Sequence, residues 1–293
     1  MKPQHIILAL LVALIWGINF TVVSIGLGSF PPLLLAALRF VVTAIPALFL
    51  PKPDVPWSRL IAISTTLFLG QFAFLFSGMA IGLPAGLASV ALQSQAFMTI
   101  LIASIVLRER PAARQIGGTI VAFGGLAIIT STVGGAGFSV VGIGLCLAAA
   151  LCWATGNVLL RGVGKTDMLS LVVWLSLIPP IPLFGLSLLL NGPRTIGHAL
   201  LTLNWSGAGA VLYISIISTL IGYSIWGKLM KQYPAATVAP FSLLVPIFGV
   251  ASAAIILGEK FDLLRICGIA LVLVGLIIVV FPLQKMITKL WRN

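Results

Sequence analysis

Charged side chains are scarce in this sequence of 293 residues. Only 8% of the residues are Asp, Glu, Lys or Arg, whereas 60% are hydrophobic, and the mean hydropathy is +1.21. A water-soluble domain of this length needs a far more polar surface, so the composition excludes one. The solvent of most of this chain is therefore lipid, and the bilayer is its first predicted partner.

Acidic residues and histidines are absent from the middle of the long apolar runs. Those that the chain has lie at the ends of the runs or between them: Asp54, Glu109, Asp167, Glu259, Asp262, His5 and His198. Proton relays through membranes usually use such residues. Their absence argues against a relay in the bilayer, against an embedded enzyme, and against an exporter of organic cations, which needs a buried carboxylate. Facilitated diffusion and coupling through protonation of the substrate both stay open.

Cysteines are few as well. Cys146, Cys152 and Cys267 fall within apolar runs and form neither a CxxC motif nor a Cys/His cluster, which favours packing over a disulfide or a metal site. The sequence also lacks a nucleophile triad and a phosphate-binding glycine loop, so we predict no catalytic residue, metal or cofactor. The first apolar run has no Ala-x-Ala cleavage site, which predicts an uncleaved first span.

Long apolar runs are what the sequence has in abundance. Divided at charges, prolines and glycine clusters, they predict ten membrane-spanning helices, over residues 4–27, 30–51, 59–81, 84–107, 114–131, 139–160, 168–190, 206–227, 234–257 and 262–282. Each run is long enough to cross the hydrocarbon layer as a helix, and the alternation of barrel strands is absent. We therefore predict an all-α integral membrane protein.

The basic residues predict how the helices are oriented. With the N-terminus inside, thirteen of the 17 Lys and Arg residues lie on the inner side and three on the outer side, Arg194, Lys260 and Arg265, while Arg39 lies within a span. This asymmetry follows the positive-inside rule and places both termini in the cytoplasm. Topology thus accounts for the net charge of +12, and we predict no nucleic-acid partner.

The second half of the sequence repeats the first. At a constant offset of 150, PAGLASVALQSQAFMTILIASIVLRER lies over PAATVAPFSLLVPIFGVASAAIILGEK without a gap. The same offset pairs Pro84 with Pro234, Glu109 with Glu259, Gly118 with Gly268 and Gly125 with Gly275. We predict one repeat over residues 1–131, a glycine-rich joint over 132–138, a second repeat over 139–282 and a basic cytoplasmic tail over 283–293.

Five spans in each repeat have a consequence for symmetry. Five is an odd number, so the second copy enters the membrane upside down, and a pseudo-two-fold axis in the membrane plane should relate the two repeats. This arrangement favours a transporter that exposes one central site alternately to the two sides, although some channels are also built this way.

Arg39, in PPLLLAALRFVVTAIP, is the single charge that lies away from the ends of a predicted span. It lies about 12 Å below the outer end of that span, at 1.5 Å per helical residue. Two interpretations stay open. Arg39 is either an anchor for a substrate carboxylate or a structural arginine that snorkels outward or bonds to backbone carbonyls.

Amide and indole side chains gather at a similar depth. Gln93 and Gln95 are about 200° apart on a regular helix, so we expect one to face the centre and the other a neighbouring helix. Together these side chains predict a substrate site of eight residues, namely Trp16, Asn19, Arg39, Gln71, Gln93, Gln95, Trp153 and Asn157. In the alternative interpretation, each amide serves as a contact between helices.

The chemistry of the eight residues suggests the cargo. Amides donate and accept hydrogen bonds, indole faces attract ammonium groups, and an arginine pairs with a carboxylate. A small zwitterion such as an amino acid fits this set. A multiply charged phosphate ester would need further cations, and a hydrophobic cation would need an acid.

Three smaller features complete the pattern. Tyr223 and Trp226 lie near the inner end of the eighth run, where aromatic belts are expected. Pro240 and Pro246 predict a kink in the ninth run. Small-residue stripes in the fifth and tenth runs serve either the fold or a contact between two copies in a homodimer; they comprise Gly117, Gly118, Gly124, Gly125, Gly268 and Gly275.

Several segments carry a family resemblance over the whole chain. IWGINF in the first run, LRF in the second, and the LRER and LGEK pair that closes runs four and nine resemble the EamA family of the drug/metabolite transporter superfamily. PPLLLAALRF, QFAFLF, PAGLASVALQSQAF, SLVVWLSLIP and VAPFSLLVP resemble its amino-acid exporters. The resemblance implies a bacterial inner-membrane exporter of small amino acids and related metabolites such as cysteine and O-acetylserine, with a central cavity and broad specificity. A multidrug or other metabolite exporter of the same fold is the alternative.

Overall fold

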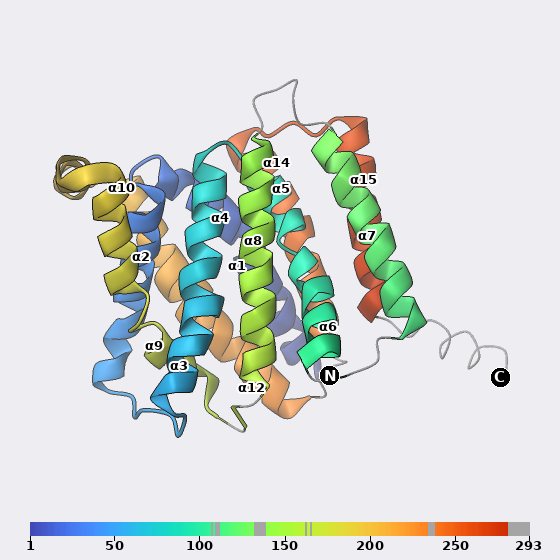
Figure 1. The fold of residues 1–293 in the computed structure, drawn as a ribbon, viewed down its shortest axis with the longest axis horizontal. Helices are drawn as coiled ribbons and strands as arrows, with labels where there is room; N and C mark the ends of the chain where they lie inside the picture. Colours follow the sequence, from blue (N-terminus) through green and yellow to red (C-terminus); the bar gives the residue numbers. More distant parts are fainter. Residues whose placement is uncertain are drawn as a thin grey trace.

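The computed structural model describes residues 1–106, 108, 112–131, 139–161, 163–164, 166–233 and 238–280. Within these ranges every regular element is a helix, and most helices run side by side between two ends of the molecule (Figure 1). The all-α prediction is therefore confirmed for the described residues. Glu109, the predicted joint over 132–138 and the predicted tail over 283–293 lie outside them.

Among the described residues, six long and four shorter apolar helical ranges overlap the predicted runs. Six are long and apolar enough to cross a membrane: Pro3–Leu27, Trp57–Ala80, Ala85–Val106, Val140–Leu160, Met168–Leu201 and Trp205–Gln232. Four shorter apolar ranges lie between them, at Pro32–Leu48, Ala113–Ile129, Phe241–Leu257 and Leu263–Val279. The helical and apolar character of the runs thus follows the prediction.

The described residues of the first half form nine helical elements in five runs. These are α1 (Pro3–Leu27); α2 (Pro32–Ala44) with the 3-10 turn η1 (Ile45–Leu48); α3 (Trp57–Ser64), the π segment η2 (Thr65–Gly70) and α4 (Gln71–Ala80); α5 (Ala85–Ala91) and α6 (Ser94–Val106); and α7 (Ala113–Ser131). Proline stands in the first turn of α1 and α2, where its missing N–H costs nothing.

The second half follows a similar plan. Its described elements are α8 (Val140–Leu160); α9 (Met168–Leu175) and α10 (Pro180–Leu201); α11 (Trp205–Leu212), the π segment η3 (Tyr213–Ile221) and α12 (Gly222–Gln232); the 3-10 segment η4 (Ala239–Leu244) and α14 (Val245–Leu257); and α15 (Leu263–Val280). Ser139, Asp167 and Asn204 cap α8, α9 and α11 by accepting a backbone N–H.

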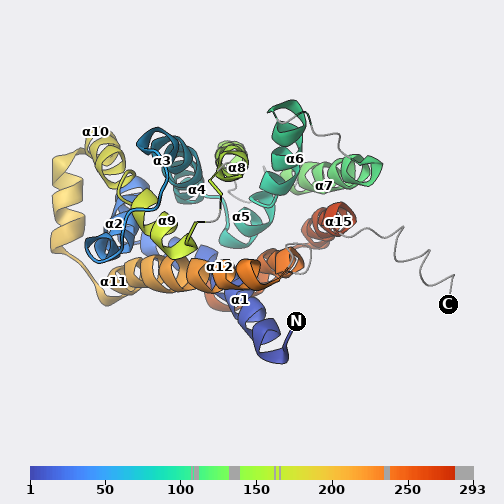
Figure 2. The same cartoon turned by 90° about the horizontal axis from the view of Figure 1, so that it is seen from below.

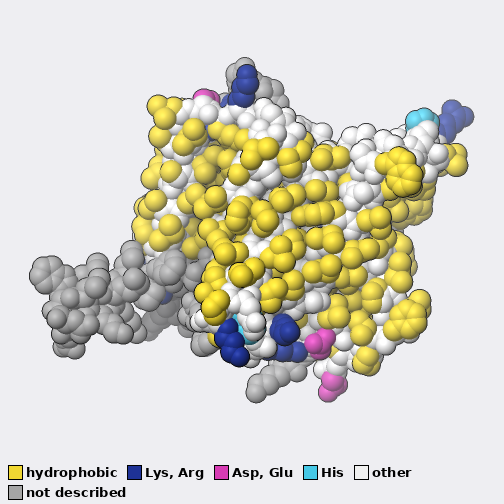
Figure 3. Space-filling view, turned by 180° about the vertical axis from the view of Figure 1, so that it is seen from behind, with side chains coloured by type: hydrophobic (Ala, Val, Ile, Leu, Met, Phe, Trp, Pro, Cys, Tyr) yellow, Lys and Arg dark blue, Asp and Glu magenta, His cyan; other side chains and the backbone are white. Residues whose placement is uncertain are grey.

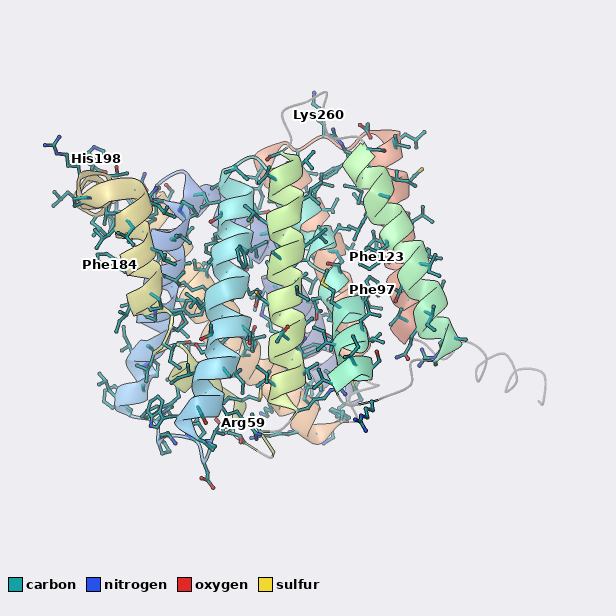
Figure 4. All side chains as sticks on the ribbon, viewed as in Figure 1. Arg59, Phe97, Phe123, Phe184, His198 and Lys260 are labelled. Atoms are coloured by element: carbon teal, nitrogen blue, oxygen red, sulfur yellow. The ribbon has the colours of Figure 1, made fainter. Side chains whose placement is uncertain are left out.

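Apolar side chains cover the outside of the bundle. On the face shown in Figure 3, hydrophobic side chains form a continuous middle zone, and the charged side chains lie along its upper and lower edges. Lys260 and His198 mark the upper end of the molecule, which the sequence predicts to be the outer end, and Arg59 marks the lower end (Figure 4). Such a surface fits a protein that is solvated by lipid.

Four of the helical runs are irregular near the middle of the molecule, and the seventh is also broken, between α9 and α10 at 176–179. The third and eighth runs contain the π segments η2 and η3, the ninth contains η4, and the fourth is broken between α5 and α6 at Leu92–Gln93. The offset of 150 pairs Leu92 with Ser242, so the fourth and ninth runs are interrupted at matching positions. The irregular ninth run follows the prediction from Pro240 and Pro246, whereas the break in the fourth run does not follow from any proline.

The seventh run extends past its predicted end but changes direction there. Helix α10 includes Gly192 at φ 78°, outside the helical region, and Pro193 follows. The predicted end at residue 190 lies two residues before this kink. The last turns of α10, which carry Arg194, therefore run across the end of the bundle (Figure 2).

Helices α7 and α15 cross closely at one edge of the molecule (Figures 1 and 2). A Cβ atom added at Gly118 would lie 2.6 Å from the carbonyl oxygen of Gly275, and one added at Gly125 would lie 2.6 Å from that of Gly268. The offset of 150 matches Gly118 with Gly268 and Gly125 with Gly275, so it converts one contact into the other. A two-fold axis between the two helices would relate the contacts in the same way. These four glycines pack within the chain, whereas a Cβ atom at Gly117 or Gly124 would meet nothing within 4 Å.

At the upper end of the molecule, α5 packs on α14 and on the loop after it. A Cβ atom added at Gly249 would lie 2.4 Å from Ser89 Oγ. The carboxylate of Glu259 accepts the backbone N–H of Ala85 at 2.7 Å and that of Gly86 at 3.1 Å. We call this contact between α5, Gly249 and Glu259 the upper closure.

Candidate functional site

A cavity of about 520 Å³ lies in the centre of the bundle. All eight residues of the predicted site line it: Trp16, Asn19, Arg39, Gln71, Gln93, Gln95, Trp153 and Asn157. They come from α1, α2, α4, α6, α8 and the break before α6. The structure therefore brings together side chains that are up to 141 positions apart in the sequence (Trp16 to Asn157).

The cavity extends toward the lower end of the molecule. Arg161, Met168, Trp226, Gly227 and Met230 line it there, at the end of α8, the start of α9 and in α12. Toward the upper end the lining includes Phe20, Arg39 and Leu75.

Arg39 is buried in the cavity wall, with 3% of its surface exposed. Its Nε and Nη2 atoms donate to Thr219 Oγ1 in η3, at 3.1 and 2.8 Å. The guanidinium lies 4.1 Å from the ring centroid of Phe72 and 5.8 Å from that of Phe40. Its Nη1 atom has no partner among the described residues. The side chain does not snorkel, because its head group is held inside the bundle.

Two of the amides present free carbonyl oxygens. Asn19 Oδ1 and Gln71 Oε1 are buried and have no hydrogen-bond partner within the described chain. The side chains of Asn19 and Gln71 are 7% and 3% exposed, respectively. Unpaired buried acceptors cost free energy, so each of these oxygens would gain stability from accepting a donor.

The other amides contact neighbouring helices. Asn157 Nδ2 donates to Gln95 Oε1 at 3.1 Å, and Gln93 Nε2 donates to the carbonyl oxygen of Ser242 at 3.3 Å. The expectation that only one of the two glutamines faces the centre is wrong, since both line the cavity. It assumed a regular helix, and the break at Leu92–Gln93 changes their relative direction.

An aromatic cluster lies in the part of the cavity toward the lower end. Trp16 Nε1 donates to the carbonyl oxygen of Ser218 at 3.0 Å, and the Trp16 ring lies 5.3 Å from the ring centroids of both Tyr223 and Trp226. Sequence reasoning assigned Tyr223 and Trp226 to an aromatic belt, but both line the cavity. Gly222, next to Tyr223, leaves room for the indole, because a Cβ atom there would lie 2.7 Å from Trp16 Nε1.

The charges of the lining favour one type of solute. Arg39 is a buried cation and Arg161 lies at the lower mouth, while no Asp or Glu is among the described residues that line the cavity. The free donor at Arg39 fits a carboxylate. The free oxygens of Asn19 and Gln71, with the indole faces, fit an ammonium group.

Comparison with known families gives a match over nearly the whole chain. The model of the EamA-like transporter family matches residues 4–131 and again residues 140–281.

Curated relatives and a solved structure give further matches. A protein of Escherichia coli named "Probable amino-acid metabolite efflux pump" is 42% identical, over 100% of this chain and 98% of that protein. A Salmonella typhimurium protein of the same name is 43% identical, over 94% of each chain. A "Probable terminal-alkyne amino-acid exporter" of Streptantibioticus cattleyicolor is 24% identical, over 95% and 94%. One crystal structure matches at 18% identity with a TM-score of 0.65, over 95% of this chain and 96% of that chain, which supports the fold alone.

Proposed function

Because this chain belongs to the EamA-like transporter family and is a multi-pass membrane protein, we propose that it exports small amino acids and related metabolites through its central cavity. The cargo we propose resembles cysteine and O-acetylserine, with broad specificity. The names of the Escherichia coli and Salmonella relatives support an amino-acid cargo. The eight lining residues named above are the proposed substrate-binding residues.

One observation carries this proposal. The cavity holds a buried guanidinium with a free Nη1 donor, together with free carbonyl oxygens of Asn19 and Gln71. An α-amino acid carries a carboxylate for the first and an ammonium group for the second. Binding such a solute would satisfy three buried polar atoms that otherwise have no partner.

We propose that the chain crosses the inner membrane of a bacterium with ten helices. Both termini and the lower end of the molecule then face the cytoplasm. The distribution of Lys and Arg supports this orientation. The cavity is then open to the cytoplasm, and the upper closure separates it from the outside. In the opposite state the upper closure would separate and the lower end would close, which is alternating access.

Export of organic cations is the less favoured function. A buried ammonium needs a carboxylate or an equivalent acceptor, and the described lining supplies a guanidinium instead. The aromatic cluster around Trp16 would attract a cation, but Arg39 would repel it in the same cavity.

Uptake into proteoliposomes tests the proposal. We would measure uptake of labelled cysteine, O-acetylserine, threonine and phenylalanine by the purified full-length protein, with and without a proton gradient. Saturable uptake is expected, and it should fall at least about 10-fold in Arg39→Ala, since a charge-assisted hydrogen bond is lost. Thr155→Ala is the control, because Thr155 is only half-buried, does not line the cavity and bonds to its own helix. Folded protein that takes up none of the four would contradict the proposal.

A further inference from the structure

Arg39 is held by a second residue that sequence reasoning did not find. Thr219 belongs to η3 in the second half of the chain, 180 positions away from Arg39, and only 1% of its surface is exposed. Its hydroxyl oxygen accepts from both Nε and Nη2 of Arg39. The two donors lie on one edge of the guanidinium plane, so a single oxygen fixes that edge.

The π segment places this hydroxyl where it can accept two bonds. Thr219 Oγ1 donates to the carbonyl oxygen of Ile214, five residues earlier, at 2.7 Å. In the same run, Ser215 Oγ donates to Val211, four residues earlier, as in a regular helix. A hydroxyl has one donor and two acceptor positions, and Thr219 uses all three. Its orientation is therefore fully determined by Ile214 and Arg39.

The face of the guanidinium is fixed as well. The Phe72 ring centroid lies 4.1 Å from the central carbon of the guanidinium, close enough for a stacked cation–π contact. With one edge on Thr219 and one face on Phe72, the group cannot rotate freely. Nη1, the nitrogen left without a partner among the described residues, is buried beside the cavity, so a solute reaches it only when the lining moves aside.

We propose that Thr219 positions Arg39 as a carboxylate site, so that a solute needs a free carboxylate to bind tightly in the cavity. This inference rests on the proposed function and deepens it, because it names the group that makes a molecule a cargo. Thr219 itself touches no solute, since it lies behind the lining and acts through Arg39.

Pairs of ligands that differ only in the carboxylate test this role. Purified full-length protein would be melted with threonine, threonine amide, phenylalanine and phenylalanine amide, and the dissociation constants would be derived from the shifts in melting temperature. We expect the wild type to bind each acid at least about 10-fold more tightly than its amide, the usual scale of a charge-assisted hydrogen bond.

Three variants at two positions separate positioning from general damage. Thr219→Val keeps the branched shape and removes the hydroxyl, so the preference for the acid should be lost while the affinity for the amide stays within about 2-fold. Thr219→Ser keeps the hydroxyl and should restore the preference. Ser215→Ala removes a neighbouring buried hydroxyl that does not touch Arg39, and it should bind like the wild type. Phe72→Leu provides a second test by removing the stacked face.

Each result bears on the inference. A wild type that binds acid and amide equally would overturn it, as would Thr219→Val protein that keeps the preference or that loses acid and amide affinity alike. If Thr219→Val does not fold, an unchanged preference in Phe72→Leu would overturn it. Selective binding of acids without uptake into proteoliposomes would contradict the proposed export but support the carboxylate site.

Discussion

Adding one methyl group at Gly249 should open the upper closure. In the present structure a Cβ atom at this position would lie 2.4 Å from Ser89 Oγ and 2.5 Å from Ser89 Cβ. Rotating the serine side chain moves its Oγ but not its Cβ, so α5 itself must move away from α14. If α5 separates from α14 in the alternative state, Gly249→Ala penalises only the closed arrangement.

The size of this effect follows from two terms. Overpacking by one methyl group typically costs about 1 to 3 kcal/mol. Compared with glycine, alanine also stabilises a helix by about 0.5 to 1 kcal/mol. Because α14 is helical in both arrangements, this gain does not change the ratio of closed to open molecules. The ratio of closed to open molecules should therefore fall by about 5- to 150-fold.

Distances between two spin labels would measure the shift. Labels on Ile81→Cys, at the upper end of α4, and on Leu263→Cys, at the start of α15, would use two exposed positions, in protein whose three native cysteines are replaced by alanine. In the Gly249→Ala protein, a second and longer distance between the two labels should appear.

A control and a rescue sharpen the measurement. A Cβ atom at Gly144 meets nothing within 4 Å, so Gly144→Ala should leave the distance unchanged. In the double variant with Ser89→Gly, the clashing atoms are gone and the short distance should return. A folded Gly249→Ala protein with the wild-type distance would refute the assignment of this contact as the upper closure.

Two more outcomes can be measured on the same protein. Gly118→Ala should lower the free energy of unfolding by about 1 to 3 kcal/mol, since its Cβ would meet the backbone of α15, whereas Gly117→Ala should not lower it; thermal melting of both variants checks this. Burial raises the pKa of Glu259 in the upper closure, where it shares a small cavity with Lys260 and Arg265, more than the N–H groups of α5 lower it. In an open arrangement water returns this pKa to its ordinary value, so the closed arrangement binds the proton more tightly. Lowering the pH through the interval between the pKa values of Glu259 in the closed and open arrangements should therefore favour the shorter distance between the two spin labels. Glu259→Gln should remove this pH dependence.

Much of the arrangement could be predicted because lipid restricts where polar side chains lie. A side chain such as Gln71 or Asn157 at mid-depth has to face the interior of the bundle, so depth along each run was enough to assign it to the centre. The same reasoning fails for aromatic residues, which are tolerated both in the interior and at the membrane surface. Tyr223 and Trp226 were therefore assigned to the surface, although they line the cavity.

The contacts of Arg39 could not be predicted for a different reason. Thr219 is one of several Ser and Thr residues in its run, and a regular helix gives each hydroxyl the same local acceptor, four residues earlier. Only the π segment directs Thr219 to Ile214 and Arg39. A π segment leaves no composition signal comparable to that of proline, so this positioning depends on tertiary structure.

The irregular segments and the cavity depend on each other. Each interruption frees backbone carbonyls that lipid could not satisfy, so it is tolerated only where other donors reach it. Two of these carbonyls accept from side chains that line the cavity, since Ser218 in η3 accepts from Trp16 and Ser242 in η4 accepts from Gln93. These side chains thus have two tasks, to line the cavity and to satisfy the backbone that the irregular helices expose. Replacing Trp16 or Gln93 by alanine would therefore disturb the shape of the cavity as well as its chemistry, which makes Thr219→Val, located behind the lining, the cleaner probe of cargo selection.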